Sequence, residues 1–250
     1  MRRALRIGTV TTLLGAACAL TPASAQATTG GCHLPRFGPG ASYRPVFHPG
    51  GHTARVTNPW FPLRPGTTWI YRGVEDGHRT VDVVHASRHT RVIAGVRTRV
   101  VHDRNYQAGV LVERTRDYYA QDRCGNVWYF GEDTAELNRH GRVTTREGTW
   151  HSGQNGALPG VIMQAQPQLG RRFRQEWLKG HAEDVFKAVD LSARAKVPFG
   201  RFSNVLRTDE TTALEPGVLD NKFYAKGIGE LSERTVKGGH EAQSLVEILG

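Results

Sequence analysis

Acidic residues are the side chains of this chain whose types and placing suggest chemistry. They fall in three separate segments: Glu132 with Asp133, then Glu176, then Glu183 with Asp184. Carboxylates that converge from separate segments can bind a calcium-like ion or act as a general acid and base. The alternative is that these acids lie apart in solvent or pair with Lys and Arg, as most surface charges do. We keep them as candidate catalytic residues of a hydrolase or metal-dependent enzyme.

Aromatic residues form a second candidate site, in two runs that flank a tight turn at 123–126. Side chains alternate along a strand, so Asn126, Trp128 and Phe130 are expected on one face of a sheet. Large residues occur on both faces, which predicts that neither face meets bulk water. The functional interpretation is an aromatic-lined cavity that binds a ligand through Tyr119, Asn126, Trp128 and Phe130. The structural interpretation is plain core packing.

Signatures of common enzymes are absent from the sequence. It contains no Gly-x-Ser-x-Gly elbow, no Gly-rich phosphate loop and no Cys-x-x-Cys pair. His48 and His52 place two imidazoles close together, but a zinc site needs three or four fixed ligands. We therefore predict no metal and no cofactor, and we favour a protein without enzymatic activity.

The first residues predict export. Arg2, Arg3 and Arg6 precede an apolar stretch at 7–20, and small residues follow it at 21–25. This order is typical of a Sec-type signal peptide that is cleaved near Ala25. The alternative is an N-terminal membrane anchor, but the apolar stretch is short and interrupted by Thr and Gly. We expect a secreted or extracytoplasmic protein with no transmembrane segment after processing.

Positive charge is spread along the chain. The formal net charge is +10, and +7 without the three leader arginines. Arg97 and Arg99 share one face of a predicted strand. The next predicted strand carries Glu113 and Asp117 on one face, so cross-strand ion pairs are expected. Because no basic cluster is combined with exposed aromatics, we expect no nucleic-acid partner.

Two cysteines, Cys32 and Cys124, remain once the leader with Cys18 is removed. In an oxidising compartment a lone pair of cysteines is more often a disulfide than a reactive centre. We predict a disulfide between Cys32 and Cys124, which would join the N-terminal segment to the body of the domain if the geometry permits.

The pattern after residue 66 predicts a sheet. Short runs rich in Val, Tyr, Trp and Thr are broken by turns such as Asp76-Gly77 and Ala108-Gly109, which is typical of an antiparallel meander. Helix is limited to one or two turns, at 134–138 and 182–188. We predict a mainly β fold, a single antiparallel meander curled into a barrel or half-barrel with little helix.

Three parts are expected along the chain: a signal peptide at 1–25, an irregular Gly- and Pro-rich lead-in at 26–65, and a β domain at 66–250. The lead-in lacks sustained periodicity, so we expect it to lie on the domain surface. The apolar segment 157–163 has two interpretations. It is either a lid over the open side of the sheet or a buried crossover that completes the core.

Three motifs resemble those of a group of secreted bacterial proteins of unknown function, over most of 58–248. They are Asn58-Pro59-Trp60-Phe61-Pro62-Leu63 with Pro65-Gly66-Thr67-Thr68-Trp69, then Asp122 with Gly125-Asn126-Val127-Trp128-Tyr129-Phe130-Gly131-Glu132-Asp133, then Ala157-Leu158-Pro159-Gly160. The tail, 222–231, is similar to the closing hairpin of periplasmic lipoprotein-carrier-like half-barrels. The resemblance implies an exported β half-barrel and supplies no activity. Arg123-Cys124 departs from the two polar residues expected at its turn, so a disulfide there would be particular to this chain.

Three functions stay open at this point. The leading one is an exported, non-enzymatic β protein that binds a small apolar or amphipathic ligand, or an envelope component, in its curved sheet. The first alternative is a hydrolase or metal-dependent enzyme that uses the acidic residues, and the second is a structural envelope protein. An aromatic-lined void favours binding, paired carboxylates in a cleft favour hydrolysis, and a filled core favours the structural role.

Overall fold

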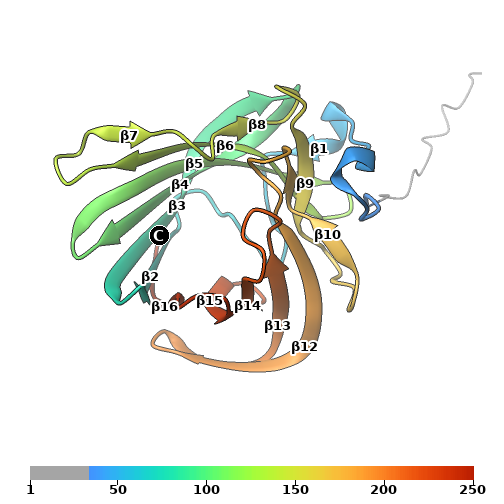
Figure 1. The fold of residues 1–250 in the computed structure, drawn as a ribbon. Helices are drawn as coiled ribbons and strands as arrows, with labels where there is room; N and C mark the ends of the chain where they lie inside the picture. The colour runs from blue at the N-terminus through green and yellow to red at the C-terminus, as the bar shows by residue number, and fades with distance from the viewer. Residues whose placement is uncertain (1–33) are drawn as a thin grey trace, which may run out of the picture. The chain divides into compact units, whose positions relative to one another are not determined.

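The computed structural model describes residues 34–250, which form one large antiparallel sheet and two short 3-10 turns (Figure 1). The predicted signal peptide, its cleavage near Ala25 and Cys32 lie outside the described residues. Within residues 34–250, no helix has the length and apolar character needed to cross a membrane. The elements are η1 (Gly40–Ser42), η2 (Pro49–Gly51), β1 (His52–Thr53), β2 (Thr68–Glu75), β3 (His78–Ile93), β4 (Val96–Gln107), β5 (Val110–Asp122), β6 (Val127–Leu137), β7 (Val143–Thr145), β8 (Trp150–His151), β9 (Leu158–Met163), β10 (Arg172–Arg174), β11 (Glu176–Trp177), β12 (Val185–Val197), β13 (Gly200–Thr211), β14 (Leu219–Ala225), β15 (Gly229–Lys237) and β16 (Ala242–Leu249).

The strands follow one another in the order β10-β12-β13-β14-β15-β16-β2-β3-β4-β5-β6-β9-β11, with β1 on β5 and β7 and β8 on β6. The last strand, β16, pairs with β2, so the two ends of the meander meet in the middle of the sheet. The two edge strands, β10 and β11, are separated in sequence only by Gln175. The sheet therefore curls back on itself and is nearly closed into a barrel, which confirms the predicted fold class (Figure 1).

Two-residue turns set the register of the longest strands. Asp76 and Gly77 have φ angles of 46° and 81°, and Ala108 and Gly109 have φ angles of 50° and 84°. Positive φ at both central residues is the type I′ geometry, whose twist matches that of paired strands. Glycine adopts it at the second position without a Cβ clash. The two turns predicted from the sequence thus connect β2 to β3 and β4 to β5.

The two expected helical turns are wrong. Residues 134–138 run through the end of β6, and 182–188 lead into β12. Phe186 on β12 has strand partners on both sides, Phe173 and Glu210. Pairing on both sides outweighs the weak helix preference of segments this short.

The apolar segment 157–163 is part of the sheet, because it contains β9. This strand pairs with β6 on one side and β11 on the other. Val161 and Met163 are almost completely buried, at 0% and 1% exposure. The segment therefore completes the core, as the second of its two interpretations expected.

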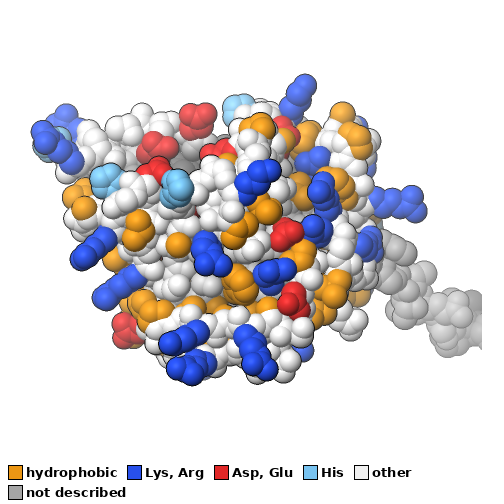
Figure 2. Space-filling model, turned by 60° about the horizontal axis from the view of Figure 1, so that its bottom comes forward, with side chains coloured by type: hydrophobic (Ala, Val, Ile, Leu, Met, Phe, Trp, Pro, Cys, Tyr) orange, Lys and Arg blue, Asp and Glu red, His pale blue; other side chains and the backbone are white. Residues whose placement is uncertain are grey.

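The sheet has an inner face, which surrounds a cavity, and an outer face. The main core cluster of buried side chains, including Trp69, Val127 and Leu245, packs on the inner face. On the outer face of β4–β6, Trp128 and Phe130 belong to a second cluster that the lead-in covers. The ring of Phe47 meets the ring of Phe130 edge-on, with 5.4 Å between centroids. Elsewhere the outer surface carries many Lys and Arg side chains, as the face in Figure 2 shows.

Candidate functional site

A cavity of about 230 Å³ lies on the inner face of the sheet. Residues from β2–β5, β14–β16 and the end of the lead-in surround it. Its lining includes an aromatic and apolar set, Phe61, Leu63, Trp69, Tyr71, Tyr119 and Tyr224, and an ionisable set, Asp82, Asp103, Lys222, Glu230 and Glu233. The cavity is therefore amphipathic, because both kinds of side chain line the same space.

The aromatic lining is held in place by ring contacts and hydrogen bonds. The Tyr119 ring stacks on Tyr129 with 4.8 Å between centroids, and Phe61 meets Tyr119 edge-on at 5.2 Å. The Trp69 indole N–H donates to the Ile228 carbonyl oxygen at 2.8 Å. Such rings have few rotatable bonds and large apolar faces. They provide a fixed apolar surface for a ligand.

Three carboxyl groups of the cavity have pKa values above their usual range. Burial raises the pKa of Asp82 to about 6 and the pKa of Glu230 to about 8. Burial, and then the charge of Asp82, raises the pKa of Asp103 well above its usual value. Asp82 and Asp103 are close enough to share a hydrogen bond. Near neutral pH this part of the cavity retains protons that a bound cation would displace.

Among residues 34–250, Lys222 is the one cation that lines this cavity. Its Nζ atom lies 3.2 Å from Glu233 and 3.5 Å from Glu210, and 24% of its side-chain surface is accessible. Burial lowers the pKa of this ammonium group, but the charges of Glu210 and Glu233 outweigh burial and hold the pKa well above its usual range. Lys222 is thus charged and fully engaged with carboxylates. The carboxyl groups of Asp82, Asp103 and Glu230 in the cavity lining therefore have no ion pair with Lys222.

A second acidic group lies further along the inner face, on β5, β6 and β11. The Tyr129 hydroxyl donates to Asp117 Oδ1 at 2.7 Å and lies 3.1 Å from Glu132 Oε2. Burial raises the pKa of both Asp117 and Glu132 to about 8. Burial, and then the charges of Asp184 and Glu132, raises the pKa of Glu176 well above its usual value. Three of the five predicted acids, Glu132, Glu176 and Asp184, are therefore neighbours.

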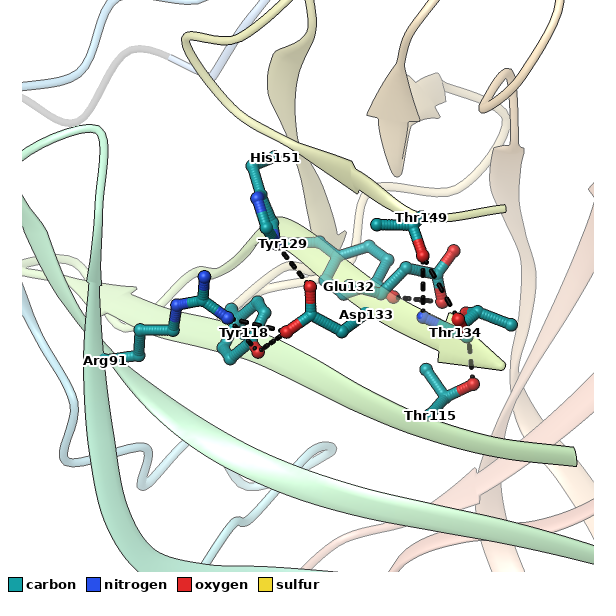
Figure 3. Close-up of polar contacts among 9 residues, drawn as sticks. All are labelled: Arg91, Thr115, Tyr118, Tyr129, Glu132, Asp133, Thr134, Thr149 and His151. Atoms are coloured by element: carbon teal, nitrogen blue, oxygen red, sulfur yellow. Dashed lines mark hydrogen bonds and ion pairs between the residues drawn. The ribbon is translucent and has the colours of Figure 1, made fainter. Parts of the chain in front are cut away.

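The other two predicted acids lie elsewhere. Glu183 accepts a hydrogen bond from the backbone N–H of Gly180 at 2.7 Å in an exposed turn. Asp133 lies on the outer face, on the opposite side of β6 from Glu132 (Figure 3). A break in the ladder near Gly131 does not alter this division, because successive side chains of a strand point to opposite faces.

Asp133 is the centre of a polar network on the outer face (Figure 3). Its Oδ2 atom accepts hydrogen bonds from Tyr118 and Arg91, and its Oδ1 atom lies 3.0 Å from Nε2 of His151. Burial alone would raise the pKa of Asp133, but the Tyr118 hydrogen bond and the charges of Arg91 and His151 outweigh it and lower the pKa. Asp133 is thus ionised and already satisfied by partners.

The four predicted ligand-binding residues are divided between the faces. Tyr119 lines the cavity. Asn126 and Trp128 each donate a side-chain hydrogen bond to Asp122 Oδ2, at 2.9 Å and 3.0 Å. Phe130 is fully buried in the outer cluster. The structure therefore places only Tyr119 of this set at the cavity and the other three in packing beneath the lead-in.

The described residues contain no group of three or more His, Cys, Asp or Glu side chains that could hold a metal ion. His52 Nδ1 lies 3.0 Å from the His48 carbonyl oxygen, and its ring packs edge-on against Trp128 and Phe130. Cys124 lies in the turn after β5, where its backbone N–H donates to Asp122 Oδ1. The Cys32–Cys124 disulfide stays a prediction, because Cys32 lies outside residues 34–250.

The expected ion pairs of Arg97 and Arg99 with Glu113 and Asp117 are wrong. Arg99 is buried and donates from Nε to the Ala54 carbonyl oxygen at 3.1 Å. Glu113 and Asp117 lie on the inner face with the other acids, where burial raises the pKa of each. In the register of β4 and β5, Arg99 lies opposite Tyr119 and Glu113 lies opposite Asn105, so neither acid is directly opposite one of these arginines.

Sequence reasoning missed the acids and the lysine of the cavity. Val81-Asp82-Val83 places a carboxyl between two β-branched residues, whereas Asp103 lies between His102 and Arg104. Lys222 directly precedes Phe223 in a strand near the end of the chain. A charge between β-branched residues is the signal that could have identified Asp82, whereas Asp103 and Lys222 have polar neighbours in their strands and no such local signal.

No protein-family model matches this chain, and no curated protein matches it. Among solved structures, a protein of Bacteroides fragilis that is regarded as exported and has a YmcC-like fold is 14% identical, with a TM-score of 0.44 over 76% of this chain and 99% of that one. A protein of Parabacteroides distasonis that is regarded as a lipoprotein is 9% identical, with a TM-score of 0.41 over 76% of this chain and 98% of that one.

Proposed function

We propose that this chain is an exported, non-enzymatic β protein that binds a small amphipathic ligand inside its nearly closed barrel. The observation that carries the proposal is the two-sided lining of the inner cavity. Phe61, Trp69 and Tyr119 offer an apolar surface, while Asp82 and Glu230 offer carboxyl groups. Export rests on the signal-peptide pattern of residues 1–25.

The size and charge of the cavity limit the kinds of ligand that can bind in it. A volume of about 230 Å³ lies below the ~300 Å³ at which drug-sized pockets begin, so the ligand or its buried part is small. Lys222 is already paired with Glu210 and Glu233, which leaves Asp82, Asp103 and Glu230 to meet the polar end of the ligand. These groups favour a cationic or hydrogen-bond-donating end, such as an amine, beside an apolar body.

Native mass spectrometry of the mature protein purified from its own source is the direct test. A non-covalent adduct that disappears on denaturation is the expected result. A thermal-shift series with amphipathic amines, their neutral alcohols and their carboxylate analogues should then show the largest stabilisation with the amines. Asp103→Asn should weaken that shift, whereas Asp133→Asn, on the outer face, should not. Equal shifts for all three ligand types would contradict the charge argument, and no adduct or shift would contradict the binding function.

A second candidate function is acid–base hydrolysis on the same inner face. It is favoured by one observation, the carboxyls of Glu132 and Glu176, which lie near each other and have raised pKa values. Glycoside hydrolysis uses a pair of carboxyl groups, one of which acts as a protonated general acid, and a raised pKa keeps a carboxyl protonated near neutral pH. Release of a chromophore from aryl glycosides by the wild-type protein, and its loss in Glu132→Gln, would support this function. Activity that persists in that variant would exclude these residues.

A further inference from the structure

A basic groove lies on the outer face of β4, β5 and β6, away from the amphipathic cavity. Its basic residues are His102 and Arg104 on β4, Arg114 and Arg116 on β5, and Arg146 between β7 and β8. The groove has a volume of about 350 Å³. Three parts of the chain that are separate in sequence therefore contribute positive charge to one concave surface.

The strand register places like charges directly opposite each other in this groove. Arg104 pairs with Arg114 across the β4–β5 ladder, and His102 pairs with Arg116 two positions further on. Like charges at directly opposite positions destabilise an antiparallel pair. The β12–β13 ladder of the same sheet shows the usual arrangement, because Lys187 lies opposite Asp209 with 3.0 Å between charged atoms.

Asp133 lies opposite a groove arginine, Arg116, across the β5–β6 ladder, but its carboxylate is engaged by other residues. Within residues 34–250, none of the four groove arginines forms an ion pair. Two acids line the groove, Asp103 and Asp133. Asp133 is held by Arg91, Tyr118 and His151. The Asp103 carboxyl neighbours Asp82 on the inner face.

The pKa of His102 reflects the positive charge of the groove. Burial lowers the pKa of its imidazole, and the charges of Arg104, His85, Arg116 and His89 lower it further. A bound anion would relieve this repulsion, because opposite charge favours the protonated imidazole. His102 is therefore both a member of the groove and a probe of its charge.

We propose that this groove binds a soluble molecule that carries two or more neighbouring phosphate groups. Guanidinium groups suit this chemistry, because their planar donors form paired hydrogen bonds with phosphate oxygens. Arg114 and Arg116 on β5 and Arg104 on β4 would each contact oxygens of such an anion. Arg146, from the segment between β7 and β8, would contact it from the other side. The site is independent of the inner cavity and does not rest on its function.

Calorimetric titration with sodium tripolyphosphate tests the proposal. The wild-type protein should bind at about 50 mM salt and more weakly at about 200 mM. The double substitution Arg114→Ala with Arg116→Ala should weaken binding by about tenfold or more. Both residues are exposed, so the fold should be kept, and an unchanged melting temperature would verify this. The matched control is Arg194→Ala with Arg201→Ala, which removes the same charge from exposed positions of β12 and β13.

Further readouts separate this site from general attraction to a basic protein. The NMR pH titration of His102 should move to a higher pKa when tripolyphosphate is added, and the double groove variant should no longer respond to the anion. Equal weakening in the groove and control variants would overturn the proposal, since net charge alone would then explain binding. Binding to phosphatidylglycerol vesicles without binding to tripolyphosphate would also overturn it, in favour of a membrane surface. Absence of binding at low salt would do the same.

Discussion

At the scale of single residues, Lys222 supplies the positive charge that offsets acidic side chains on the inner face. Its Nζ atom lies between Glu210 and Glu233, and Glu210 is only 7% exposed. If one member of a buried group of paired charges is removed, the remaining charges stay buried without a partner. The resulting loss of stability is larger than the net stabilisation that the intact group provides. The cavity therefore depends on this one ammonium group for its stability as well as its charge.

We expect Lys222→Met to lower the free energy of unfolding by about 3 kcal/mol. The matched control is Lys187→Met, which removes one partner of the more exposed Lys187–Asp209 pair and should cost about 1 kcal/mol or less. Urea unfolding followed by tryptophan fluorescence measures both. Similar small losses in the two variants would show that Glu210 and Glu233 do not depend on Lys222.

Single residues also show where sequence reasoning succeeded and where it stopped. Large residues on both faces of the aromatic strands predict a cavity that binds a ligand through Tyr119; Tyr119 lines the inner cavity, and ligand binding by it stays a prediction. Trp128 and Phe130 carry the same signal, yet they face the other way and pack under Phe47. Local alternation separates the two faces of a strand but does not say which one surrounds a void. Which face surrounds the cavity depends on how the whole sheet closes.

At the scale of elements, the chain closes its sheet through β9 and the segment between β10 and β11. Gly160 lies against this segment so closely that a Cβ atom would meet the backbone carbon of Gln175 at 2.2 Å and the Arg174 oxygen at 2.4 Å. Backbone atoms at such distances cannot yield without moving a strand. Close approach at Gly160 therefore holds the two edges of the sheet together.

Gly160→Ala should destabilise the protein by about 2 kcal/mol or more, because either β9 or the 174–176 segment must shift. Gly50→Ala is the control, since a Cβ atom at Gly50 meets nothing within 4 Å. Thermal melts of the two variants and the wild type measure the difference. Hydrogen exchange should show faster exchange of β9 and β11 amides in Gly160→Ala. Unchanged melting and exchange would show that β9 and the 174–176 segment can accommodate a Cβ atom at position 160.

The meander was predictable from sequence at this scale, while the pairing of its ends was not. Asp76-Gly77 and Ala108-Gly109 are local turn signals, and each connects adjacent strands as expected. The partnership of β16 with β2 joins strands from opposite ends of the β domain in sequence, and no local pattern encodes it. The acids Glu132, Glu176 and Asp184 come together for the same non-local reason, so no local sequence pattern predicts their convergence.

At the scale of the whole molecule, charge is divided between the two faces of the sheet. Burial raises the pKa of Asp117, Glu132 and Glu230 to about 8 on the inner face. The outer face carries the arginines, including the basic groove. A basic protein with an acidic interior therefore has two surfaces that attract opposite ligands.

This division predicts that stability falls as the pH rises from about 4.5, just above the unfolded-state pKa of Asp and Glu, to the folded-state pKa of about 8. The inner carboxyls have folded-state pKa values above their unfolded values, so the folded state binds more protons in this range. Stability then decreases by about 1.4 kcal/mol per pH unit for each proton that only the folded state retains. Below about pH 6.5 the lowered pKa of His102 acts in the opposite direction, because protonation of its imidazole destabilises the fold.

Differential scanning calorimetry at half-unit pH steps measures the slope. Asp117→Asn with Glu132→Gln should flatten the decrease, because amides cannot ionise. Asp133→Asn should leave the slope unchanged, since the pKa of Asp133 is lowered and that group stays ionised throughout the range. A melting temperature that rises with pH would contradict the picture of a protonated interior. A saturating amphipathic amine should also reduce the slope, because a cation in the cavity stabilises the ionised carboxyls and so couples ligand binding to proton release.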